Sequence, residues 1–327
     1  MMIIRSAHAV VLALGVLAAP LAAEAQQSQK VYRIGMLERT SPAINAANLD
    51  GFKRGLRELG YVEQRDFVIE YRSADGRNER FPTLATELVR LNVDVIVTRG
   101  TPATLAAKNA TATIPVIIVG IGDPVGQGIV ASLARPGGNL TGLSPMVTEM
   151  YQKRVELLKA LVPRAVRIAA LLNMGNPANP PEWREIEKAA RSLGMQGQLL
   201  DVRKSEDLEA AFDAAVRQHV DGLVVGVDTV TQANRERIVD LAAKHRIPAM
   251  YATTEFVGGL VAFGVNFAEL YRHAASLVEK IFKGAKPAEL PMEQPTKFEL
   301  VINMKTAKAL DLTIPRSLLL RADQIIE

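Results

Sequence analysis

The chain of 327 residues contains no cysteine. That absence excludes disulfide bridges, cysteine-ligated metal sites and a thiolate nucleophile. It also excludes a lipoprotein anchor, which needs a cysteine at the processing site. Export stays possible, because an oxidising compartment tolerates a chain without cysteine.

Motifs typical of enzymes are also missing. The sequence has no G-x-x-x-x-G-K-[ST], no G-x-S-x-G and no H-E-x-x-H. Its histidines have no metal-ligand spacing; they are His8, His219, His245 and His273. The sequence therefore predicts no cofactor, no metal site and no enzymatic activity.

Charge of one sign is not concentrated anywhere, and long apolar runs are scarce. The net charge of +4 is spread along the chain, so we expect no nucleic-acid partner. One apolar stretch, Val10 to Leu21, follows Arg5 and is too short to span a bilayer. It ends at Ala23-Glu24-Ala25, an A-x-A cleavage site. Residues 1–25 are therefore predicted to be a cleavable signal peptide, and the mature protein is expected in the periplasm without stable membrane insertion.

About 300 residues remain after the signal, enough for two lobes of ordinary size. From Val31, short β-branched runs alternate with amphipathic stretches, a pattern typical of βαβ units around parallel sheets. In the first half we expect strands at Val31–Leu37, Phe67–Arg72, Val93–Thr98 and Ile114–Val119, with helices near Asn45–Leu59, Asn78–Leu91 and Pro102–Asn109.

The same alternation restarts after a predicted helix at Val147–Leu161. Here the expected strands are Arg167–Leu172, Gln198–Val202, Gly222–Val227 and Ile247–Tyr251, and the expected helices lie near Pro181–Leu193, Glu206–His219 and Gln232–His245. Two similar βα runs predict an α/β protein with two Rossmann-like lobes.

Three segments could carry the chain between the lobes. They are Gly142 to Pro145, the glycine-marked strand Gly258–Gly264 before a helix at Phe267–Phe282, and Gly284 to Pro295 before a strand at Phe298–Asn303. Several crossings would make a hinge that allows the lobes to close on a ligand. The alternative is that these segments are surface loops of one long domain.

Ligands of open α/β sheets bind beyond the carboxyl ends of the strands, so the loops after the strands are the candidate site. Thr101 is a plausible N-cap ahead of Pro102, in a turn that could hold a carboxylate. Asp123 is either a helix cap or an acidic group that faces the cleft. In the second half, Asn179 with the following Pro-Pro-Glu is interpreted as a capping arrangement.

Two long segments resemble a known family. They are G-D-P-V-G-Q-G-I-V-A-S-L-A-R-P-G-G-N-L-T-G from Gly122 to Gly142, and E-Q-P-T-K-F-E-L-V-I-N-M-K-T-A-K-A-L-D-L-T-I-P from Glu293 to Pro315. The final R-A-D-Q-I-I-E fits the same pattern. Over the whole mature chain, the sequence is similar to ABC transporter substrate-binding proteins, a family that includes receptors for tryptophan and other aromatic amino acids.

This resemblance implies a type I periplasmic-binding-protein fold, with a three-stranded hinge and the ligand enclosed between the lobes. We expect a first lobe of residues 26–144 with roughly 265–290 and a second of 145–264 with roughly 291–327. The implied partners are a small-molecule ligand and an ABC permease with its ATPase. The protein itself is expected to be a monomer. By resemblance, the amides and hydroxyls from Thr98 to Thr101 hold a ligand carboxylate and Asp123 its ammonium group. The full expected ligand-binding set is Glu38, Thr98, Gly100, Thr101, Gly122, Asp123, Asn173, Asn176, Asp228 and Thr253.

Two other functions use a cleft of this kind. A ligand-sensing receptor domain has the same fold, but a repressor would need a helix-turn-helix where this chain has a signal. A periplasmic α/β enzyme would need catalytic groups that the sequence does not offer.

Overall fold

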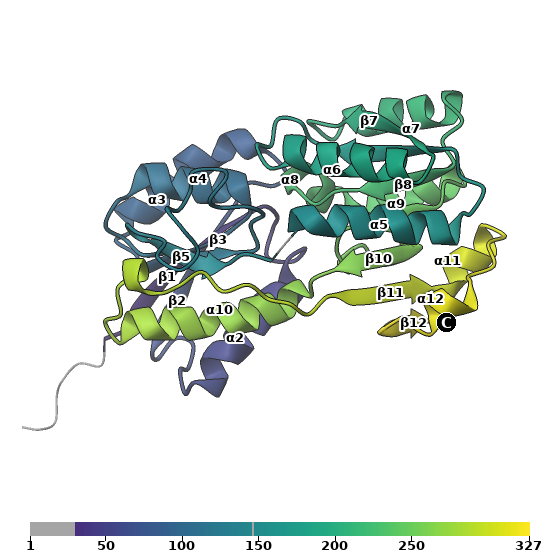
Figure 1. The fold of residues 1–327 in the computed structure, drawn as a ribbon. Helices are drawn as coiled ribbons and strands as arrows, with labels where there is room; N and C mark the ends of the chain where they lie inside the picture. The colour runs from purple at the N-terminus through teal and green to yellow at the C-terminus, as the bar shows by residue number, and fades with distance from the viewer. Residues whose placement is uncertain (1–29, 146) are drawn as a thin grey trace, which may run out of the picture.

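Two β-sheets organise the chain into two α/β lobes that lie side by side (Figure 1). The computed structural model describes residues 30–145 and 147–327. The expected signal peptide, residues 1–25, lies outside the described residues. The predicted fold class, α/β with two lobes and mainly parallel sheets, is confirmed.

The first lobe is built on a parallel sheet with the strand order β2-β1-β3-β4-β5. Its strands are β1 (Tyr32–Glu38), β2 (Phe67–Ser73), β3 (Val95–Arg99), β4 (Val116–Val119) and β5 (Leu140–Leu143). Its helices are α2 (Ala46–Glu58), α3 (Phe81–Arg90), α4 (Thr101–Ala110) and, from much later in the chain, α10 (Phe267–Phe282), with short 3₁₀ turns at Asn78–Arg80 and Pro287–Glu289.

This sheet is buried on both faces, which explains the continuous apolar runs of its strands. Successive side chains of a strand point to opposite faces. Ile34 and Met36 pack in the core with α2 and α10, whereas Leu37 packs in the core with α3 and α4.

The second lobe has a seven-stranded sheet with the order β12-β11-β10-β9-β8-β6-β7. Its strands are β6 (Arg167–Leu172), β7 (Gln196–Asp201), β8 (Gly222–Val225), β9 (Ala249–Tyr251), β10 (Val261–Gly264), β11 (Glu299–Asn303) and β12 (Gln324–Ile326). Its helices are α5 (Val147–Leu161), α6 (Asn179–Ser192), α7 (Asp207–Arg217), α8 (Thr229–Ala233), α9 (Arg235–Lys244), α11 (Met304–Ala309) and α12 (Arg316–Leu319).

The two sheets share one topology. Read from β7, the second sheet runs β7-β6-β8-β9-β10, the same order as β2-β1-β3-β4-β5, and then continues with antiparallel β11 and with β12. In each lobe the order reverses beside the first strand, between β1 and β3 and between β6 and β8. This reversal is the point at which open α/β sheets bind ligands.

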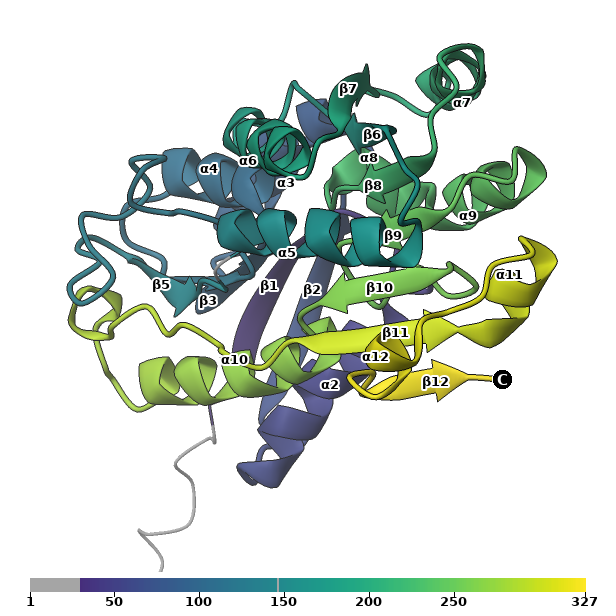
Figure 2. The ribbon, with the colours of Figure 1, turned by 45° about the vertical axis from the view of Figure 1, so that its right-hand side comes forward.

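The described chain passes between the lobes after β5, after β10 and after α10, and Figure 2 shows α10 beside α2 while β11 returns to the second sheet. The first and third crossings are hydrogen-bonded to each other. Ser144 N donates to Glu293 O at 2.9 Å, and Glu293 N donates to Gly142 O at 2.8 Å.

Several predicted elements are confirmed to the residue, including Val147–Leu161, Arg167–Leu172 and Phe267–Phe282. One predicted element is wrong, and several elements were not predicted. Gly142 and Leu143, at the start of the expected crossing Gly142 to Pro145, belong to a strand that was not predicted, β5, which pairs with β4. The single helix expected at Gln232–His245 is wrong, since Asp228 caps a separate α8 that ends at Ala233, and α9 begins at Arg235. The elements after β11 were not predicted.

None of the helices in the described part of the chain is long and apolar enough to cross a membrane.

Candidate functional site

Loops that follow the strands of both sheets meet between the lobes, and an ion pair joins them there. Arg99, at the end of β3, donates from Nη1 and Nη2 to the two carboxylate oxygens of Glu255 in the loop after β9, at 2.8 and 2.5 Å. Asn48 of α2 donates to the same carboxylate at 2.7 Å. Within the second lobe, Thr253 and Gln232 also donate to Glu255, each at 3.1 Å. We call Arg99, Glu255 and Asn48 the interlobe latch.

The latch is an ionised pair in a mostly dry setting. Burial alone would raise the pKa of Glu255, but the charge and hydrogen bonds of Arg99 lower it to about 2. The guanidinium of Arg99 also lies over the ring of Phe267, 3.6 Å from its centroid. The side chain of Arg99 is only 4% exposed and that of Glu255 20%, so the pair depends on the lobes staying together.

Two charged residues at the end of β1 lie next to the latch. Tyr271 of α10 donates to Glu38 at 2.5 Å, and burial raises the pKa of Glu38 to about 7 despite the nearby arginines. Arg39 donates from Nε to the carbonyl of Arg99 at 3.3 Å, while burial and repulsion by Arg99 lower its pKa to about 10. Gly100 makes room for Arg39, because a Cβ there would lie 1.9 Å from Nη2.

The second lobe presents a buried polar group built on α6 and α8. Asp228 caps α8 by accepting from the amides of Val230 and Thr231, at 2.7 and 2.9 Å. Asn179 donates from Nδ2 to the carbonyl of Asn173 at 2.9 Å and to Asp228 at 3.3 Å. Burial raises the pKa of Asp228, and the charge of Arg39 is among the factors that offset this. The guanidinium of Arg39 in the first lobe therefore lies near the carboxylate of Asp228 in the second lobe.

Glu182 of α6 is a buried carboxyl group beside these residues. It is 5% exposed, and burial raises its pKa to about 7, offset by the neighbouring Tyr151 hydroxyl and Arg154 charge on α5. The guanidinium of Arg154 packs on the Tyr151 ring at 4.5 Å and donates to the carbonyls of Phe263 and Ala252.

A cavity of about 370 Å³ opens at this point between the lobes. Ligand pockets of this size range are common for small molecules. The first lobe lines it with the loop after β4 and the second lobe with the start of α6; the lining residues are Leu105, Gly122, Asp123, Gly126, Gln127, Pro177, Ala178, Pro181, Glu182 and Arg184.

Four of the residues predicted for the site lie at the ends of β1 and β3. Glu38 is described above. The Thr98 and Thr104 hydroxyls are 3.0 Å apart, and Thr104 donates to the carbonyl of Gly100 at 2.8 Å, so Thr98 is engaged within its own loop. The prediction that Thr101 caps α4 is wrong by one residue. Gly100 is the cap, with a φ of 79° that suits glycine, and Thr101 is the first helical residue.

The predicted residues after β4 line the cavity. Gly122 accepts from Gln127 at 2.7 Å, and Asp123 accepts from the amide of Gly126 at 2.8 Å. Asp123 is exposed and has a φ of 37°.

The predicted residues of the second lobe are mostly buried loop-shaping groups. Asn173 and Asn176 accept from the amides of Gly175 and Ala178, at 3.0 and 3.2 Å. Asp228 caps α8 and Thr253 supports Glu255, as described above. Of the predicted set, Gly122 and Asp123 line the interlobe cavity, and the others lie in or beside loops that follow strands of the two sheets.

Sequence reasoning missed Arg39, Arg99, Glu182 and Asn48, and it assigned Asn179 to capping. The capping interpretation of Asn179 is wrong, since the residue before it, Ala178, is the cap of α6 and the Asn179 amide bonds to Asn173 and Asp228 instead. Arg39 and Arg99 carried a usable signal, because each is a charged residue at the end of a strand beside the topological reversal.

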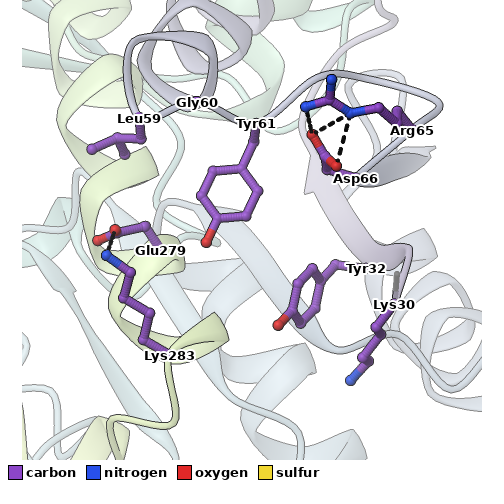
Figure 3. Close-up of a pocket in the computed structure, with 9 residues that line it drawn as sticks. All are labelled: Lys30, Tyr32, Leu59, Gly60, Tyr61, Arg65, Asp66, Glu279 and Lys283. Carbon is purple, nitrogen blue, oxygen red and sulfur yellow. Dashed lines mark hydrogen bonds and ion pairs between the residues drawn. The ribbon is translucent and has the colours of Figure 1, made fainter. Parts of the chain in front are cut away.

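A second cavity, of about 340 Å³, lies at the opposite edge of the first sheet, near the start of β1 and the end of α10 (Figure 3). Its cations are already ion-paired: Arg65 with Asp66, Lys283 with Glu279, and Lys30 with Asp94. In the described ranges, no cluster of histidine and acidic residues is arranged to hold a metal ion. The interlobe cleft is therefore the candidate site.

Comparison with known proteins shows the family of this chain. Residues 38–326 match the family described as ABC transporter substrate binding protein. The chain is 27% identical to a tyrosine-binding protein of Clostridioides difficile (strain R20291), covering 87% of this chain and 82% of that protein.

Two solved structures are similar over 90% of this chain and 100% of theirs. One is a conserved domain protein from Vibrio cholerae O1 biovar El Tor str. N16961, with a TM-score of 0.84 and 28% identity. The other is an ABC domain from Streptococcus pneumoniae in complex with L-Trp, with a TM-score of 0.81 and 30% identity.

Proposed function

This chain belongs to the family of ABC transporter substrate-binding proteins, and from that premise we propose that it captures an amino acid between its lobes. Membership implies a small-molecule ligand and a permease to receive it. The relatives named for tyrosine and L-Trp make an amino acid the first ligand class to consider.

One observation carries the proposal: complementary polar atoms are left unpaired on the two sides of the cleft. In the first lobe, Nη1 of buried Arg39 has no hydrogen-bond partner among the described residues. In the second lobe, the same holds for Oδ1 of Asn179 and Oε2 of Glu182. Buried polar atoms without partners cost about 1–3 kcal/mol each. A zwitterion would satisfy both sides, with its carboxylate at the arginine and its ammonium group at the acceptors.

We further propose that the ligand is released unchanged and that the protein acts in the periplasm after removal of residues 1–25. We propose a first lobe of residues 26–144 with roughly 265–290 and a second of 145–264 with roughly 291–327, a division that the separate sheets of the described residues support. The proposed ligand-contacting loops are those after β1, β3, β4, β6, β8 and β9.

A thermal-shift screen of the twenty L-amino acids tests the proposed function. We expect one or a few to raise the melting temperature, since a ligand at 100 times its dissociation constant adds about 2.7 kcal/mol of stability. Chromatography of the recovered compound should show it intact. A screen in which no amino acid shifts the melt would refute the proposed ligand class, and a modified compound would support an enzyme instead.

A further inference from the structure

Two unpaired atoms of the second lobe, Oδ1 of Asn179 and Oε2 of Glu182, are hydrogen-bond acceptors. Nδ2 of Asn179 faces two acceptors, the Asn173 carbonyl and the Asp228 carboxylate, so the amide cannot be flipped without losing both bonds. Its free atom is therefore the oxygen. The amide of Gln127, across the cavity, is assigned in the same way. Its Nε2 donates to the carbonyl of Gly122, so the unpaired atom is Oε1.

Glu182 combines three properties in this acceptor group. It is buried, its Oε2 lacks a hydrogen-bond partner among the described residues, and it lines the interlobe cavity opposite Gln127. The cavity wall thus offers a carboxyl group to whatever enters, and an ammonium group is the matching donor.

We propose that Glu182 binds the cationic amino group of the ligand and selects amines over the corresponding desamino acids. This inference rests on the proposed function and adds the group that recognises the nitrogen. Glu38 is less suited, because Tyr271 donates to it at 2.5 Å. The Tyr151 hydroxyl lies close enough to Glu182 to lower its pKa, but the two make no hydrogen bond within 3.5 Å. Asp123 is also less suited, because it is exposed and bonded to the amide of Gly126. Water competes for an exposed carboxylate, so a buried one discriminates better.

The charges around Glu182 make its binding role depend on pH. Tyr151 and Arg154 face it from α5, Asp228 from the start of α8, and Arg39 from the first lobe. Burial raises the pKa of Glu182 to about 7. Only the ionised form pairs with an ammonium group, so affinity for an amino acid should fall by about tenfold between pH 8 and pH 6.

Calorimetric titration with matched probes tests the proposal. The probe pairs are L-tyrosine with 3-(4-hydroxyphenyl)propionate and L-tryptophan with indole-3-propionate. For wild type we expect the amino acid to bind at least 30-fold more tightly than its desamino partner, in the range of a buried charge pair. In Glu182→Gln this preference should shrink to a few-fold, and the pH dependence between 6 and 8 should flatten.

Two controls separate a loss of recognition from a loss of structure. Glu185→Gln, on the same helix, should keep the wild-type preference, because Glu185 is not among the residues that line the cavity. Ligand-free Glu182→Gln should melt at a higher temperature than wild type at pH 8. The pKa of Glu182 in the folded protein, about 7, lies above its unfolded value, so the free energy of unfolding falls as pH rises between these two values. Glutamine does not ionise and avoids this loss of stability.

The outcomes for the proposal and for the proposed function are distinct. If wild type binds the amino acids but Glu182→Gln keeps the full preference for the amine, Glu182 is not the amine site. If a stable Glu182→Gln variant lost the same factor of affinity for the amino acid and for its desamino partner, that result would also contradict the proposal. Failure of every amino acid to bind wild type would overturn the proposed function, and this inference with it.

Discussion

Glu255→Ala is expected to open the ligand-free protein, because Glu255 supplies the anion of the interlobe latch. Without it, Arg99 and Arg39 would be two buried guanidinium groups close together, with less negative charge to balance them. Removing one partner of a buried ion pair typically costs about 3–5 kcal/mol. Here the cost can be relieved by separation of the lobes, which returns Arg99 to water. Small-angle scattering should therefore show a larger radius of gyration at pH 7.

The latch has a matched control on the surface of the first lobe. Glu269 bonds to Arg54 and Arg272 at about half exposure, so Glu269→Ala should leave the radius unchanged and cost less than about 1 kcal/mol. A scattering profile of Glu255→Ala identical to that of wild type would show that the latch does not hold the lobes together.

The pH dependence of the latch has a definite sign. The folded pKa of Glu255, about 2, lies below its unfolded value, so its contribution is full above about pH 4.5 and is lost as pH falls towards 2. Wild type should thus remain closed at pH 4.5, where an exposed ion pair would already be weakening.

Gly51→Leu is expected to give the second large effect, this time on stability. Gly51 and Gly55 of α2 face α10, where an added Cβ would lie 2.3 Å from the carbonyl oxygen of Ala268 and 2.4 Å from that of Arg272. These atoms are backbone, so the helices would have to separate. Overpacking costs about 1–3 kcal/mol for extra methylenes, and a leucine against backbone should exceed the upper value. Urea unfolding measures the change.

The helix propensity of leucine would by itself stabilise the Gly51→Leu variant, so a net loss of stability is a stringent test of close packing. Leucine is favoured over glycine inside a helix by roughly 1 kcal/mol. Arg57→Leu places the same residue on the exposed face of α2 and should stay within about 0.5 kcal/mol of wild type. If Gly51→Leu were as stable as Arg57→Leu, close packing of α2 on α10 would not be what fixes α10 to the first lobe.

Local pattern was sufficient to predict most elements and the fold class. The runs Val95–Val97 and Val116–Val119 are apolar and buried on both faces, and the helix Phe267–Phe282 places its apolar residues on one side. Such periodicities are properties of contiguous residues. They also predict that a ligand binds at the carboxyl ends of the strands, since these ends meet at one edge of a sheet.

Elements that depend on pairing or capping were less accessible. Leu140–Leu143 becomes a strand because it pairs with β4, and α8 exists as a separate helix because Asp228 caps it. Both segments are short, so their own residues supply too little periodicity to predict them.

The chemistry of the cleft was decided by the tertiary structure. Glu182 looks like an ordinary polar residue at a helix start, and its character comes from burial beside Tyr151 and Arg154 of α5. Glu255 is ionised because Arg99, 156 positions away in the chain, meets it across the lobes. Sequence determined which loops reach the cleft. Burial and the partners brought together by the two lobes decided which side chains in those loops are charged, paired or free, because electrostatic free energies depend on distance and solvent access.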